Sequence, residues 1–330
     1  MKCTNKLFFS GILTICLLTC GCGSDVAIDN PYDIGASATN AQHETTADFS
    51  GSVASVRYFA EDLCVAPEEN THSDDVTEDV VEAMGVFLPA DKTISYQKNI
   101  YQKMYPASTT KILTAYLAIT QANLDDMVTV SAHAADQAMD SSVCGIRAGD
   151  QIKLSDLLYG LMLRSGNDAA VAVAEHISGS EEAFAELMNE TARSFGATNS
   201  HFVNANGLHD DSHYTCVYDL YLIFEHAIEE DFFMQLIQTT SYTVYYTDAS
   251  GAQKTQTWSN TNKYLTGEVT PPEGVTVLGG KTGTTHAAGY CLVLLSKNDK
   301  QEPVISIILK SDGRSNLYYV MNQVLANFAK

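Results

Sequence analysis

Apolar residues along this chain follow two different periods, and the period changes twice. Near the start, apolar runs predict strands at residues 83–88 and 93–96, with a turn between them. The stretch that follows places apolar residues three or four positions apart, which is typical of helices. Beyond it, runs bounded by turn-forming residues predict strands at residues 243–247, 256–258, 275–284, 290–295 and 304–309.

The helical period predicts one helix that starts at Pro106 and others that follow it. Pro106 suits a first turn, because its φ is already helical and its missing N–H is not needed there. The order of strand pair, helices, strands and helix predicts an α+β fold in which the first hairpin joins the later sheet. The remaining helices are expected at residues 155–163, 169–176, 180–194, 218–229 and 316–328.

The first residues have the features of an export signal. Two lysines precede an apolar run at residues 7–18, which is too short to span a bilayer comfortably. The small residues and cysteines that follow resemble a bacterial lipoprotein signal, in which a cysteine is lipidated after cleavage. We favour Cys22, which follows a glycine. Cys20, which has a leucine three positions earlier, is the alternative, and an ordinary secretory signal stays open.

Composition changes again after this signal, and it suggests how the chain is divided. Residues 1–21 are expected to be the lipoprotein-type signal peptide, and residues 22–52 a flexible acidic and polar tether. Apolar residues return at about residue 53, so residues 53–330 are expected to form the folded domain. No C-terminal β-domain is expected after it.

The charge of the chain limits its partners. With 330 residues and a net charge of −21, its isoelectric point is about 4.6. No basic patch could dominate such a field, which argues against nucleic acid and against an anionic membrane surface as partners. An acidic surface that keeps an exported protein soluble is the simplest interpretation.

Eight cysteines occur, and half of them lie within the first 22 residues. The other four are widely spaced and include no C-x-x-C pair, so their spacing gives no support for zinc. An even number permits disulfides, but small buried thiols are the favoured interpretation. These four are Cys64, Cys144, Cys216 and Cys291.

A serine and a lysine share the first turns of the helix predicted at Pro106. Ser108 and Lys111 are three residues apart, so the hydroxyl and the amine can touch on one helix face. An amine kept neutral by burial and cationic neighbours could take the serine proton and make it a nucleophile. Ser95 and Lys98 have the same spacing, but in a predicted strand they point to opposite faces and should not meet.

A second motif, Ser165-Gly166-Asn167, lies in a loop between two predicted helices. A hydroxyl in such a loop can relay a proton, and an amide can hold a peptide through its donor and its acceptor. A similar tripeptide at residues 296–298 ends an apolar strand, and we interpret it as a surface turn.

A third motif, Lys281-Thr282-Gly283, occurs once and lies in a predicted strand. Lys281 supplies positive charge, and Thr282 and Thr284 supply hydroxyls for a substrate carboxylate. Gly283 has no side chain, so a substrate strand could approach the sheet edge closely there.

Together the three motifs resemble the serine-type D-alanyl-D-alanine carboxypeptidases, which are low-molecular-weight penicillin-binding proteins. The motifs occur in the family's order, and the flanking residues 106–111, 145–150, 158–170 and 280–293 are also similar. The resemblance covers residues 53–330. It implies a β-lactamase/penicillin-binding-protein-like transpeptidase fold, an antiparallel sheet flanked by helices with a helical subdomain at about residues 107–235.

The resemblance also implies roles for individual residues. Ser108 would be the acylated nucleophile, Lys111 its general base and Ser165 a proton relay. The backbone N–H groups of Ser108 and Thr284 would form the oxyanion hole. Arg314 is a candidate by its position after the last strand. The substrate-binding residues would be Asn167, Lys281, Thr282, Gly283, Thr284 and Arg314.

By the same resemblance, the substrates would be peptidoglycan pentapeptide stems ending in D-Ala-D-Ala, and β-lactam antibiotics would be covalent inhibitors. No cofactor and no metal are implied. The protein would act outside the bacterial cytoplasmic membrane, held to its outer face through the N-terminal lipid only.

Three other interpretations are weaker. A β-lactamase would share the nucleophile but needs fast deacylation, and the closest approach to a Glu-x-x-Leu-Asn segment, residues 186–189, lies inside a predicted helix. A non-catalytic wall-binding relative would not need the catalytic residues, and all of them are present in this chain. The loop at residues 209–213 has two imidazoles and two carboxylates, but no H-E-x-x-H pattern supports a metal site there.

Overall fold

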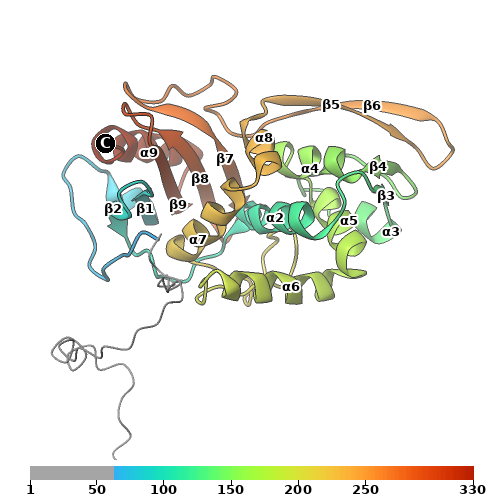
Figure 1. The fold of residues 1–330 in the computed structure, drawn as a ribbon, viewed down its shortest axis with the longest axis horizontal. Helices are drawn as coiled ribbons and strands as arrows, with labels where there is room; N and C mark the ends of the chain where they lie inside the picture. Colours follow the sequence, from blue (N-terminus) through green and yellow to red (C-terminus); the bar gives the residue numbers. More distant parts are fainter. Residues whose placement is uncertain (1–62) are drawn as a thin grey trace, which may run out of the picture. The chain divides into compact units, whose positions relative to one another are not determined.

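The computed structural model describes residues 63–330 (Figure 1). The signal peptide, the tether and the candidate lipidation residues Cys20 and Cys22 therefore lie outside the described residues. Within residues 63–330, no helix is long and apolar enough to cross a membrane.

A five-stranded antiparallel sheet, in the spatial order β2-β1-β9-β8-β7, joins the two ends of the described chain (Figure 1). β1 pairs with β9, so the first hairpin joins the late strands, as the order of elements predicts. β7 pairs only with β8 and forms an edge of this sheet. The strands are β1 (Val81–Leu88), β2 (Thr93–Lys98), β7 (Thr276–Thr285), β8 (Gly289–Lys297) and β9 (Pro303–Ser311).

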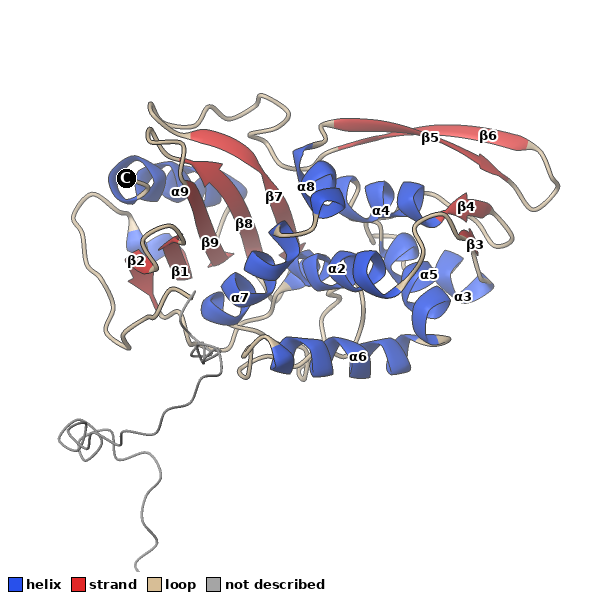
Figure 2. Ribbon diagram, in the orientation of Figure 1, coloured by secondary structure: helices blue, strands red, loops and turns tan. Residues whose placement is uncertain are grey.

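Helices cover both faces of this sheet (Figure 2). α9 (Arg314–Phe328) packs on one face, where Leu317 and Met321 join a buried cluster with Leu292 of β8. α7 (Val217–Ile228) and α8 (Asp231–Gln238) pack on the other face. Because both faces are covered, β8 and β9 are continuous apolar runs without alternation.

α2 (Lys111–Gln121) is mostly buried, and α4 (Leu154–Leu163), α5 (Asn167–Ser178), α6 (Glu181–Ser194), α7 and α8 pack around it (Figure 1). The turn η2 (Ala107–Thr110) leads into α2, α3 (Ala132–Ala135) packs on α5, and η1 (Glu78–Val80) lies beside β1. Ser180 caps α6, because its hydroxyl accepts the N–H of Ala183.

A second sheet, in the order β3-β4-β5-β6, lies beside the helices and not in the main sheet (Figure 2). It consists of β3 (Met127–Thr129), β4 (Gln151–Lys153), β5 (Ser241–Thr247) and β6 (Gln253–Ser259). The sequence predicts β5 and β6 but not β3 or β4, since three residues are too few to show a period. For the same reason it does not predict the four-residue helix α3.

The interpretation of residues 296–298 as a surface turn was wrong. Ser296 belongs to β8 and is fully buried, and Asn298 is buried as well. The Asn298 side chain accepts the backbone N–H groups of Lys300 and Glu302, so it organises the β8–β9 connection from inside. The preference for buried thiols is confirmed, because all four described cysteines are buried and free.

Gly279 of β7 allows α8 to approach the strand, since a Cβ at this position would lie 2.1 Å from the carbonyl oxygen of Ile237. We expect Gly279→Ala to lower the free energy of unfolding by about 1–3 kcal/mol, because backbone must move. At Gly313, the N-cap residue of α9, the nearest neighbour of such a Cβ is 3.6 Å away, so Gly313→Ala should cost only the capping preference, less than about 1 kcal/mol. Urea unfolding of both variants measures this, and equal midpoints would contradict it.

Candidate active site

Ser108 lies in a 3₁₀ turn, η2, that leads into α2. The sequence predicts a helix from Pro106, and the structure divides it into this tighter turn and a regular helix. Ala107, just before the serine, has a left-handed backbone with φ of +49°, a strained conformation for a non-glycine residue. Gly207 packs directly against Ala107. A Cβ at position 207 would lie 1.8 Å from the Ala107 carbonyl oxygen, so a larger residue would not fit there.

The Lys111 amine is fully buried and has three polar neighbours. Its Nζ lies 3.1 Å from Ser108 Oγ, 2.8 Å from Asn167 Oδ1 and 2.6 Å from the carbonyl oxygen of Asn206. The predicted contact between Ser108 and Lys111 is confirmed. Burial, and then the nearby charge of Lys281, hold the pKa of Lys111 well below its usual range.

These three oxygens can accept the three N–H groups of a charged amine, and the same geometry also serves a neutral one. The Asn167 and Asn206 oxygens can only accept hydrogen bonds, so they take the two N–H groups of an uncharged amine. The lone pair is then left for the one neighbour that can donate, which is the Ser108 hydroxyl.

The second serine–lysine pair does not meet, as predicted. The Ser95 hydroxyl donates to the carbonyl oxygen of Phe328 at 2.7 Å. The Lys98 amine donates to the carbonyl oxygens of Glu78 and Val81, each at 2.7 Å. Both side chains therefore tie the ends of elements together.

Ser165 and Lys281 bring the second and third motifs together. Ser165 lies between α4 and α5 with φ of +58°, and its hydroxyl accepts a hydrogen bond from Lys281 Nζ at 2.9 Å. Lys281 also donates to the carbonyl oxygen of Thr282 at 2.9 Å. Burial lowers the pKa of Lys281 to about 7. Two buried amines thus flank the serine hydroxyls.

Gly283 serves a contact that the sequence did not predict. A Cβ at Gly283 would lie 3.0 Å from the backbone nitrogens of both Ser108 and Thr109. The missing side chain lets β7 lie against the backbone of the serine turn, whereas we expected it to admit a substrate strand. The neighbouring Thr282 turns its hydroxyl to that of Thr261, 2.7 Å away.

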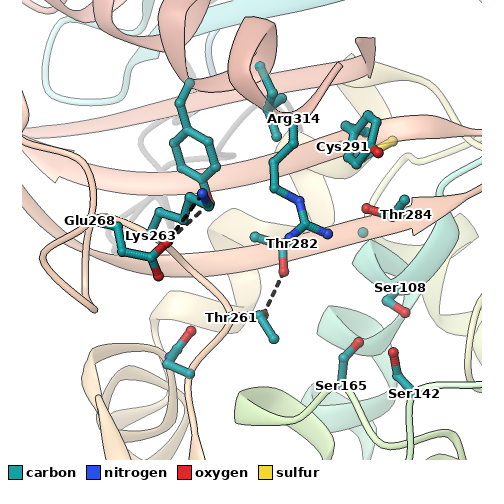
Figure 3. Close-up of a pocket in the computed structure, with 15 residues that line it drawn as sticks. Ser108, Ser142, Ser165, Thr261, Lys263, Glu268, Thr282, Thr284, Cys291 and Arg314 are labelled. Atoms are coloured by element: carbon teal, nitrogen blue, oxygen red, sulfur yellow. Dashed lines mark hydrogen bonds and ion pairs between the residues drawn. The ribbon is translucent and has the colours of Figure 1, made fainter. Parts of the chain in front are cut away.

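A cavity of about 330 Å³ opens between β7, the serine turn and the first residue of α9. In Figure 3 the hydroxyl groups of Ser108, Ser142 and Ser165 lie on one side of β7, and Arg314 extends from α9 toward Thr282. One acidic residue lines the cavity, Glu268, and it pairs with Lys263 at 3.2 Å. The cavity therefore combines hydroxyls, an edge strand and an arginine.

Asp168 is a structural part of this site that sequence reasoning missed. Its buried carboxylate accepts the backbone N–H groups of Cys144, Gly145 and Ile146 at 2.8–3.2 Å. The segment so held begins with Ser141 and Ser142, and the Asn167 amide donates to the Ser141 hydroxyl at 3.3 Å. An aspartate beside a motif has no sequence signal that distinguishes it from a solvated helix cap.

His213 was also missed, because the sequence placed it in a possible metal-binding loop. It is buried, and its Nδ1 accepts the N–H of Val203 at 3.1 Å. The ring proton is therefore on Nε2, which lies 2.9 Å from the Thr110 hydroxyl behind the serine turn. Burial lowers the pKa of His213 to about 4, in keeping with a neutral ring. No cluster of potential metal ligands occurs within residues 63–330.

Comparison with known proteins identifies the family to which the chain belongs. The sequence profile of the family described as D-alanyl-D-alanine carboxypeptidase matches residues 86–313. The D-alanyl-D-alanine carboxypeptidase DacF of Bacillus subtilis is 33% identical over 218 residues, which are 64% of this chain and 52% of DacF. The D-alanyl-D-alanine carboxypeptidase of Streptomyces sp. K15 is 31% identical over 249 residues, which are 72% of this chain and 83% of that protein.

The crystal structure of the Streptomyces K15 DD-transpeptidase is similar to this structure, with a TM-score of 0.68 and 30% sequence identity. The match covers 75% of this chain and 97% of the transpeptidase chain. The predicted α+β transpeptidase fold is therefore confirmed. The chain spans about half the length of DacF and of two further curated relatives. The profile match extends over more than half of the 330 residues, and the chain belongs to the D-alanyl-D-alanine carboxypeptidase family.

Proposed function

We propose that this protein is a D-alanyl-D-alanine carboxypeptidase that removes the terminal D-alanine of peptidoglycan stem peptides through a serine acyl-enzyme. The observation that supports the proposal is the contact of Ser108 with the buried Lys111 amine. The other two neighbours of this amine, oxygens of Asn167 and Asn206, can only accept hydrogen bonds. Such an amine can take the proton of the hydroxyl, and little else in its surroundings competes for the lone pair.

In the proposed acylation, Ser108 Oγ attacks the carbonyl carbon of the penultimate D-alanine and its proton passes to Lys111 Nζ. The backbone N–H groups of Ser108 and Thr284 stabilise the oxyanion. Ser165, which is hydrogen-bonded to Lys281, passes a proton to the leaving nitrogen and takes the proton held by Lys111 in exchange. D-alanine departs with an intact amine, and Ser165 and Lys111 return to their starting protonation states. Water then attacks the ester with Lys111 as base, which releases the shortened peptide and restores the serine.

In the proposed complex, the substrate lies along the edge strand β7, where an extended peptide can add to the sheet. The terminal carboxylate meets Arg314 and the hydroxyls of Thr282 and Thr284, all of which line the cavity. Asn167 holds the peptide, Lys281 keeps the local field positive, and Gly283 keeps the strand close to Ser108.

A second activity, transfer of the acyl group to an amine acceptor, is favoured by one observation. The solved Streptomyces K15 relative is named a DD-transpeptidase. Water and an amine would compete for the same Ser108 ester. Product analysis with and without added glycine separates the two activities, because transfer forms a new peptide and hydrolysis does not.

We further propose that the protein is exported and held at the outer face of the cytoplasmic membrane by a lipid on Cys22, with Cys20 as the alternative. Support comes from the lysines, the short apolar run and the cysteines of residues 1–21, followed by the polar tether of residues 22–52 and the folded domain of residues 53–330. Mass spectrometry of the mature N-terminus identifies the modified cysteine.

Ser108→Ala should lower the release of D-alanine from a D-Ala-D-Ala peptide by at least about a thousandfold, because the acyl-enzyme cannot form. Ser95→Ala is the matched control from the other serine–lysine pair. It loses a hydrogen bond to Phe328, worth about 1 kcal/mol of stability, and should keep its activity. Chromatography of the released D-alanine measures both, and equal rates for Ser108→Ala and the wild type would refute the proposal.

The pH dependence should report the protonation of Lys111. Activity needs the neutral amine, so kcat/KM should rise with pH as Lys111 loses its proton. The charge of Asp168 raises the pKa of Lys111 and that of Lys281 lowers it. We therefore expect the acidic limb to move to lower pH in Asp168→Asn and to higher pH in Lys281→Met. Asp125→Asn, at an exposed ion pair, is the control. Shifts in the same direction for the first two variants would contradict this role.

Penicillin should acylate Ser108 and form a long-lived adduct, not a rapidly hydrolysed one. Fast hydrolysis of a penicilloyl ester of the β-lactamase kind needs a carboxylate base beside the ester, and the only acid lining the cavity among the described residues is Glu268, paired with Lys263. Glu186, in the segment closest to a β-lactamase motif, is exposed on α6. Mass spectrometry of the treated protein and its Ser108 peptide detects the adduct. Rapid turnover of a chromogenic cephalosporin would favour a β-lactamase instead.

A further inference from the structure

A second cavity, of about 350 Å³, lies near the β7–β8 turn and contains two lysines from distant segments. Lys103 follows β2, and Lys310 lies near the end of β9. Both side chains are exposed to solvent. The cavity is lined by Gln102, Lys103, Met104, Tyr105, Asp211, Tyr214, Ala287 and Lys310.

Neither lysine forms an ion pair within residues 63–330. The Lys103 amine lies 4.1 Å from the centre of the Tyr214 ring, which fixes its position without neutralising it. Asp211 is the one acid in the cavity, and it has other partners, the Tyr105 hydroxyl at 3.3 Å and the His209 imidazole at 3.5 Å. Two cations that form no ion pair, against one carboxylate in the same cavity, leave a local excess of positive charge in a chain with net charge −21, and this favours an anionic ligand.

The proposed substrate path leads toward these lysines. With the terminal carboxylate at Arg314 and the scissile carbonyl at Ser108, the preceding residues continue past Thr284 toward the β7–β8 turn, where Ala287 lines the second cavity. This step rests on the proposed function. Two contacts set the direction of the peptide. Arg314 binds the terminal carboxylate on one side of the bond that breaks, and Ser108 meets the carbonyl on the other side.

The length of β7 gives the scale of this path. Ala287 lies three residues after Thr284, so at roughly 3.3 Å per residue it is at most about 10 Å further along. About three residues of extended peptide span that distance and reach the second cavity, which Lys103 and Lys310 also line.

A neighbouring cavity shares Lys310 and Ala287 but has a different charge. Its lining includes Asp79, Glu82 and Asp312 together with Lys310. A carboxylate would be repelled there, so the Lys103 side is the one that suits an anion.

We propose that the cavity between Lys103 and Lys310 binds a carboxylate carried by the substrate two or three residues before D-Ala-D-Ala. The enzyme then prefers stem peptides with a free carboxylate at that position over peptides with the matching carboxamide. Lys103 and Lys310 act as specificity residues and touch none of the reacting atoms.

The test uses pairs of N-acetylated peptides that end in D-Ala-D-Ala and carry either a carboxylate or its carboxamide one, two or three residues earlier. For the wild type at low salt we expect kcat/KM about fivefold higher for the carboxylate at the second or third position, as for one or two exposed charge contacts. The preference should shrink at high salt, because exposed charges are screened.

The variant Lys103→Gln/Lys310→Gln should lose this preference and keep its activity on the carboxamide peptides. The control Lys297→Gln/Lys300→Gln removes the same charge at the opposite end of β8 and should keep the preference. Binding of the same labelled peptides to Ser108→Ala, measured by fluorescence anisotropy, tests the cavity without turnover.

Equal rates and equal binding for the two members of every pair would overturn the inference, and so would a preference that survives in Lys103→Gln/Lys310→Gln. Loss of the preference in both double variants alike would also overturn it, because a general field and not the cavity would then be responsible. If the folded wild type releases D-alanine from no peptide, the proposed function fails, and the binding measurement still decides on the cavity.

Discussion

The site depends on one constraint: two amines are buried, and no carboxylate of the described residues is in contact with them. Lys111 and Lys281 are 0% and 1% exposed, and their hydrogen-bond partners within the described residues are amide, carbonyl and hydroxyl oxygens. A charged amine is costly to bury in such surroundings, so burial lowers the pKa of both groups, most strongly that of Lys111. The site draws its properties from keeping the many acidic residues of the described part of the chain out of contact with these amines.

Holding two such groups in place requires rigid surroundings, and most of the chain supplies them. α2 is buried among helices, so the turn that carries Ser108 cannot shift without disturbing a packed core. Gly207 and Gly283 bring two separate segments against the backbone of that turn. Asp168 fixes a third segment through backbone N–H groups. The polar atoms of the site are thus positioned by backbone contacts of remote segments.

Sequence reasoning was most successful where a local pattern carries the information. Residues three apart at a helix start must share a face, which identified Ser108 with Lys111 and separated them from Ser95 with Lys98. Long apolar runs located the strands of the main sheet. It failed where burial decides the role, because burial is a property of the assembled chain. Nothing near Asp168 or His213 in the sequence shows which groups surround them, and β3 and β4 are too short to have a period.

The pairing of β1 with β9 has a consequence for how the chain reaches its native state. Residues near 85 pair with residues near 307, so the central sheet cannot close until the chain has been synthesised as far as β9. Contacts of such long sequence separation form slowly, because a large loop must be ordered first. The strand β1, made first, therefore stays without its β9 partner until β9 has been made, so this sheet is completed late in folding.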